Sequence, residues 1–207
     1  MRLLAKILIG LLVLASLTYI YYTEVKPTVI FGLRSDYAHA IPYQKVPEGL
    51  TSLRAESCGT CHKAIYEEWK TSIYSQAYRD PFFHAYWTKD QHTWVYLNCH
   101  TPLENQQPTL VKEIPRQRVE KAFQEPNPQY DADYQSEGVT CAACHVRDGV
   151  ILGPFDDAIA PHPTKSDPTF RTPQLCYRCH SVVGGGRRNF ITGGLAAPMP
   201  NMRVGTG

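Results

Sequence analysis

The hydrophobic pattern separates an apolar N-terminal segment from a mixed polar remainder. The run from Leu3 to Tyr22 is apolar except at Lys6, Ser16 and Thr18. A helix of this length rises about 30 Å, which matches the hydrocarbon core of a bilayer. We therefore predict a transmembrane anchor over residues 1–22, which contacts the membrane through residues 3–22.

Charged residues predict the orientation of this segment. Arg2 and Lys6 lie at its start, and the positive-inside rule places that end in the cytoplasm. A cleaved signal sequence is the alternative, with Val13-Leu14-Ala15 as its cleavage site. Both interpretations export the rest of the chain, so we expect a domain on the periplasmic or extracytoplasmic side of the cytoplasmic (inner) membrane.

Beyond the anchor, three segments have a helical pattern. Apolar residues recur at four-residue spacing between residues 61 and 78, which predicts a helix there. Pro81 follows Asp80, and this pair predicts a capped helix over residues 81–89. A third helix is expected over residues 115–123.

The other segments are rich in proline and glycine, and no long alternating strand is evident. We expect a mainly α fold with extensive irregular loops. After the anchor, the expected divisions are a linker over residues 23–51, a domain over residues 52–183 and a Gly/Pro-rich tail over residues 184–207.

Charge and composition narrow the function classes. Lys+Arg 21 against Asp+Glu 19 gives a net charge of +2, so no nucleic-acid partner is expected. Outside the anchor, large aliphatic residues are scarce, whereas the chain contains 13 tyrosines and 16 prolines. Such a sequence buries little apolar surface to offset its chain entropy, so we expect an additional apolar group in the core.

Three C-x-x-C-H motifs identify that group: C-G-T-C-H, C-A-A-C-H and C-Y-R-C-H. This motif attaches haem c through two thioether bonds, and its histidine becomes the proximal iron ligand. Zinc sites use cysteine pairs two at a time, and disulfides do not require the histidine. The expected attachment cysteines are Cys58, Cys61, Cys141, Cys144, Cys176 and Cys179, and the expected proximal ligands are His62, His145 and His180.

An incomplete motif, Y-L-N-C-H, is the second of the four in chain order and has Tyr96 where the first cysteine is expected. In the same order, C-A-A-C-H is the third motif and C-Y-R-C-H is the fourth. Cys99 can form one thioether bond, and His100 is retained as a proximal ligand. A thiol left open to oxidation in an exported domain would be a liability. We therefore expect a fourth haem at Cys99 and His100, held through a single thioether.

The other histidines number four, which equals the number of expected haems. They are His39, His84, His92 and His162, and we expect them to be the distal ligands of bis-histidine haems. Met199 and Met202 are reserve ligands. Which distal histidine serves which haem is left open by the sequence.

Several pieces between residues 56 and 180 carry a resemblance to a known family. They are S-C-G-T-C-H-K-A-I-Y-E-E-W-K-T-S, N-C-H-T-P-L, E-G-V-T-C-A-A-C-H, A-P-H-P and L-C-Y-R-C-H. The chain resembles the multihaem cytochromes c typified by the tetrahaem electron-accepting partner of hydroxylamine oxidoreductase. The resemblance implies a fold built around stacked haems. This sequence departs from the family's pattern at two positions. Tyr96 stands where the family has a cysteine, and Tyr74 stands where it carries a ligand histidine. His84 is the candidate replacement for that histidine.

These features predict a membrane-anchored tetrahaem c-type cytochrome. It would transfer electrons between redox partner proteins of a respiratory or photosynthetic-type chain, alone or as a subunit of a membrane complex. Bis-histidine ligation leaves no open iron position, so we expect an electron carrier rather than an enzyme. One alternative is an enzyme with one open haem that acts on a small nitrogen compound, which would apply if His39 does not reach an iron. Another is a protomer of a cytochrome filament.

Overall fold

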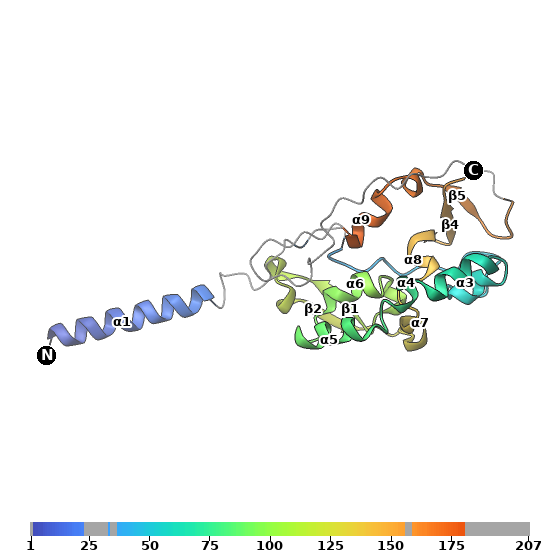
Figure 1. Cartoon of the computed structure of the whole chain (residues 1–207). Coiled ribbons are helices and arrows are strands. Elements are labelled where there is room, and N and C mark those ends of the chain that lie inside the picture. Colours follow the sequence, from blue (N-terminus) through green and yellow to red (C-terminus); the bar gives the residue numbers. More distant parts are fainter. Residues whose placement is uncertain (1, 23–32, 34–36, 156–158, 181–207) are drawn as a thin grey trace.

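The computed structural model of the chain describes residues 2–22, 33, 37–155 and 159–180. About half of this part is helical, counting short 3-10 turns, and the rest is loops and short strands (Figure 1). The expectation of a largely helical fold with many loops is thus confirmed in outline. The tail expected over residues 184–207, with Met199 and Met202, lies outside the described residues, as does most of residues 23–36.

Helix α1, Arg2–Ile20, is the one described helix long and apolar enough to cross a membrane. Its 18-residue window from Leu3 to Ile20 has a mean hydropathy of 2.3, and none of it is buried. The Thr18 hydroxyl donates to the carbonyl of Leu14 at 2.8 Å, which satisfies this polar group inside the helix. The structure therefore agrees with a membrane span, although a signal sequence has the same character.

The helix expected over residues 61–78 is divided in two. Helix α3, Lys63–Thr71, ends where Ser72 adopts an extended backbone with ψ of 160°. The Ser72 side chain then accepts from the N–H of Ser75 and caps α4, Ile73–Gln76. Serine side chains compete with helical backbone bonds in this way, and the four-residue periodicity concealed the break.

The second helix, α5, is confirmed with the predicted bounds, Pro81–Lys89. The Asp80 side chain accepts from the N–H of Phe82 at 2.9 Å, as an N-cap should. The third prediction was wrong. Residues 115–123 form two 3-10 turns, η4 (Pro115–Gln117) and η5 (Val119–Lys121), because Gln117 has a φ of +57°, which no α-helix accommodates.

The motifs that begin at Cys141 and Cys176 lie on the short helices α8 (Cys141–His145) and α9 (Gln174–His180). The incomplete motif ends on α6 (Leu97–His100), which follows the 3-10 turn η2 (Trp94–Tyr96). Helix α2 (Ala55–Gly59) carries Cys58 and ends before Cys61. Helix α7 (Ala132–Ser136) precedes α8, and two further 3-10 turns are η3 (Glu104–Gln106) and η6 (Pro168–Arg171).

Five short strands were not predicted. Strands β1 (Thr109–Glu113) and β2 (Phe123–Pro126) pair antiparallel. In the second sheet, β3 (Val146–Arg147) pairs antiparallel with β4 (Val150–Gly153), which is parallel to β5 (Thr164–Ser166). Asp148 and Gly149 join β3 to β4 with φ values of 52° and 79°. This Asp-Gly pair is the sequence signal that could have predicted the hairpin.

Two small apolar clusters form the protein core. The first contains Ile41, Leu53, Leu103, Tyr134, Ala142, Ala143 and Val146, and the second contains Leu33, Tyr37, Ala38, Trp94, Val95 and Val119. The Ile41 N–H donates to Pro102 O at 2.7 Å, and the Glu104 N–H donates to Ile41 O at 2.9 Å. The described part of the expected linker, from Tyr37 onward, therefore packs into the domain.

Candidate haem-binding centres

Three of the four cysteine–histidine motifs lie on separate short helices, α6, α8 and α9 (Figure 1). The first motif begins on α2 with Cys58, while Cys61 and His62 lie between α2 and α3. None of the seven cysteines, all of which the structure describes, forms a disulfide. In α8 and α9 the two cysteines are three residues apart, which places both side chains on one side of the helix.

The first and third motifs are neighbours in space. The thiols of Cys58 and Cys141 form a hydrogen bond, which lowers the pKa of Cys58 to about 7 and raises that of Cys141. Helices α2 and α8 are also in direct contact. Groups attached at these two motifs would therefore lie close together, although 83 residues separate the cysteines in the sequence.

The third and fourth motifs are also close. Burial raises the pKa of the Cys144 thiol, and the charges of Cys179 and Cys176 contribute to the same shift. Burial likewise raises the pKa of Tyr74, and the same three thiols add to the effect. Tyr74 therefore lies beside both motifs.

Two of the four predicted proximal histidines have a ring nitrogen next to a backbone carbonyl. His100 Nδ1 lies 2.6 Å from the carbonyl oxygen of Ala77, and His145 Nδ1 lies 2.7 Å from that of Leu152. A carbonyl oxygen only accepts hydrogen bonds, so Nδ1 carries a proton in both rings, and the neutral form of each ring has its lone pair on Nε2. Metal-binding histidines commonly have this second interaction.

The other two proximal histidines lack this interaction among the described residues. His62 is exposed and occupies the N-cap position of α3. His180 Nδ1 is buried without a hydrogen-bond partner in the described part of the chain, and so is Nδ1 of His162. Burying a ring nitrogen without a hydrogen bond costs free energy. His162 and His180 therefore suit places where a bound group completes the surroundings of the ring.

At the incomplete motif, the tyrosine is a packing residue. The Tyr96 ring packs against the second core cluster, and its hydroxyl donates to the carboxylate of Asp90. Burial and this hydrogen bond raise the pKa of Tyr96. Phe83 stacks on the His100 ring at 4.0 Å between centroids, with 18° between the planes. Burial also lowers the pKa of His100, which favours the neutral form that binds iron.

The candidate distal histidines are in different surroundings. His84 is half-buried against Tyr78 at 5.2 Å, and its charge lowers the pKa of His100, so the two share a neighbourhood. His92 is exposed, with its ring 4.8 Å from that of Trp87. His39 is exposed, and its carbonyl accepts from Arg178 of the fourth motif.

No group of three or more His, Cys, Asp or Glu side chains among the described residues is arranged to hold a metal ion. A haem brings four ring nitrogens to its iron, so at most two protein ligands are needed. The donor set at the four motifs fits haem: thiols for thioethers, and imidazoles with a bare nitrogen.

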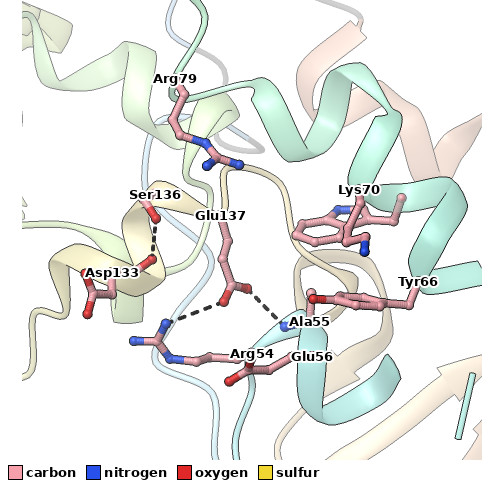
Figure 2. Close-up of a pocket in the computed structure, with 10 residues that line it drawn as sticks. Arg54, Ala55, Glu56, Tyr66, Lys70, Arg79, Asp133, Ser136 and Glu137 are labelled. Atoms are coloured by element: carbon pink, nitrogen blue, oxygen red, sulfur yellow. Dashed lines mark hydrogen bonds and ion pairs between the residues drawn. The ribbon is translucent and has the colours of Figure 1, made fainter. Parts of the chain in front are cut away.

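One polar pocket near the first motif was not anticipated from the sequence. It has a volume of about 380 Å³ and lies where α2, α3 and α7 meet (Figure 2). Its wall includes the stacked rings of Tyr66 and Trp69, 5.8 Å apart. Arg54, Arg79 and Glu137 supply charged groups. Glu137 begins the piece E-G-V-T-C-A-A-C-H. Its closeness in sequence to the third motif is the one feature of the sequence that could have marked it as a site residue.

Comparisons with protein-family models, curated proteins and solved structures give no match for this chain. Its function is therefore argued from its own residues.

Proposed function

We propose that this protein is a membrane-anchored multihaem c-type cytochrome that carries electrons between redox partner proteins outside the cytoplasm. The observation that carries the proposal is the pairing of cysteine–histidine motifs with oriented imidazoles. A backbone carbonyl binds Nδ1 of His100 and of His145, so Nε2 is the nitrogen that each neutral ring would offer to iron. The four motifs would hold three haems through two thioethers each and a fourth through Cys99.

The arrangement of the motifs favours a carrier of electrons. The first motif contacts the third, and the third is close to the fourth. Haem supplies a reversible one-electron centre at each motif when bound. A series of adjacent centres moves electrons through the domain without a substrate pocket.

The haem count tests the proposal directly. We expect a pyridine haemochrome assay on the purified, full-length protein to give four haems per chain. Oxidised and reduced spectra should be low-spin and insensitive to carbon monoxide, because histidines occupy both axial positions. A protein that matures without haem, or with zinc instead, would contradict the proposal. Replacing Cys176 and Cys179 by serine should remove one haem and serves as the internal calibration.

The role of α1 has its own test. We expect the haem-loaded protein to remain in the membrane fraction after a high-salt wash, since Leu3–Ile20 can span a bilayer. Exchanging residues 1–22 for a cleavable signal sequence should release a haem-loaded, soluble protein. Fractionation followed by haem staining measures both. A wild-type protein found soluble, with a mass that lacks the N-terminal segment, would show that α1 is a signal sequence.

A further inference from the structure

Glu137 is a mostly buried carboxylate that joins the first and third motifs. Only 16 % of its side chain is exposed. One carboxylate oxygen accepts from the Ala55 N–H at 3.0 Å, and the other lies 3.6 Å from the Arg54 guanidinium (Figure 2). Ala55 is the first residue of α2, the helix that carries Cys58. The side chain therefore fixes the segment before α8 to the start of α2.

The Glu137 charge reaches the sulfurs of both motifs. Its negative charge opposes the lowering of the pKa of the Cys58 thiol and adds to the raised pKa of the Cys141 thiol. Electrostatic interaction is mutual, so a charge that appears at either sulfur acts equally on Glu137. A group attached through these sulfurs, whose charge changes by one unit, would change the proton affinity of the carboxylate.

Titratable groups on every neighbouring element face Glu137 or line its pocket. Arg54, Glu56 and Asp131 act on its charge. Tyr66, Lys70, Arg79 and Asp133 line the pocket, and the charge of Glu137 raises the pKa of Tyr134. The Arg54 guanidinium interacts with two carboxylates. It lies 2.8 Å from that of Asp131 and farther, at 3.6 Å, from that of Glu137. Lys70 is bound to Glu67 at 2.8 Å. Arg79 lies away from the Glu137 carboxylate in Figure 2.

Together these effects raise the pKa of Glu137, so its carboxylate binds a proton more readily than an exposed glutamate does. Burial raises its pKa, and the Ala55 N–H and Arg54 only partly oppose this effect. The carboxylate also lines the pocket of about 380 Å³, whose exposed members Glu56 and Arg79 connect it to solvent. A proton therefore has both a binding group and a route to it.

We propose that Glu137 binds one proton from solvent when the haem held by Cys58 and Cys61 accepts one electron from a single-electron redox partner. The carboxylate becomes a neutral carboxylic acid on reduction and returns the proton to solvent on oxidation. Each electron is thereby accompanied by one proton, and the added charge is compensated. This inference rests on the proposed haem content.

The test is a voltammetric titration of the haem-loaded, full-length protein at a series of pH values. Reduction adds negative charge and raises the pKa of Glu137. One reduction potential should therefore fall as pH rises between the pKa of the oxidised state and that of the reduced state. The limiting slope is about 59 mV per pH unit for one proton per electron. Glu137→Gln keeps an oxygen for the Ala55 N–H and should remove this slope. Glu56→Gln, an exposed carboxylate of the same pocket, should retain it.

A second variant keeps the test independent of how Glu137→Gln folds. Arg54→Gln removes a positive charge next to the carboxylate, so the sloping region should move to higher pH. Wild-type potentials that do not vary with pH, an unchanged slope in Glu137→Gln, or an unmoved region in Arg54→Gln would each overturn the inference. Absence of haem from the intact mass would instead overturn the proposed function.

Discussion

Replacing Cys99 by serine should lower the number of covalently bound haems from four to three, while the native protein keeps four in total. The incomplete motif offers one sulfur, because Tyr96 occupies the position of the first cysteine. Without Cys99, denaturation releases the fourth haem, since only coordination bonds hold it. The intact mass of the denatured protein should therefore fall by the mass of one haem, beyond the small change of the substitution itself.

The native total is expected to persist because the iron ligand is held independently of the sulfur. The His100 ring is fixed by its hydrogen bond to the Ala77 carbonyl at 2.6 Å and by stacking on Phe83 at 4.0 Å. Neither contact involves Cys99. A haemochrome assay on undenatured protein measures this total.

Tyr96→Cys is the matched control at the same motif. It completes a C-x-x-C-H sequence, so a second thioether can form and the absorption band of the reduced haemochrome should shift to shorter wavelength as a vinyl group is lost. The substitution also removes the hydrogen bond to Asp90 and packing on the second cluster, so a modest loss of stability is expected. If the Cys99→Ser and wild-type proteins have the same covalent haem count, the site carries no thioether and the single-attachment prediction fails.

The sequence predicted those features that local chemistry determines. Cysteine–histidine spacing needs only one helical turn, and α8 and α9 each carry a complete motif. The Asp80–Pro81 start of α5 is equally local, because the cap and the fixed φ of proline act within one turn. Such features do not depend on how the remote chain folds.

Features that depend on distant contacts were not predicted. Nothing in the spacing of Cys58 and Cys141 indicates that their thiols interact, and the Ala55–Glu137 hydrogen bond joins positions 82 residues apart. The end of α3 also has a distant partner, since Trp69 Nε1 donates to Val139 O at 2.9 Å. The hydrophobic pattern of residues 61–78 does not depend on that contact and could not predict it.

Leu103→Ala should destabilise the domain by about 2–5 kcal/mol, the usual cost of removing a fully buried leucine side chain. Leu103 is 0 % exposed and lies in the first core cluster. Because small domains are stable by only about 5–15 kcal/mol, the change should lower the urea midpoint of the haem-loaded protein strongly. Far-UV circular dichroism during urea unfolding measures it.

Ile73→Ala is the control, since Ile73 is 78 % exposed at the start of α4 and should change stability by less than about 0.5 kcal/mol. Equal, small effects at both positions would mean that the protein clusters contribute little and that the bound haems alone hold the fold.

A large effect at Leu103 would have a structural consequence for the motifs. The same cluster contains Ala142 and Ala143, which lie between the cysteines of the third motif, and Ile41, which pairs with Leu103. Packing at Leu103 therefore positions α8, the helix to which a haem would be attached. Leu103→Ala should then also broaden the optical or paramagnetic signals of one haem before global unfolding, whereas Ile73→Ala should leave them unchanged. In that case the small protein core acts chiefly by fixing where the haems are held.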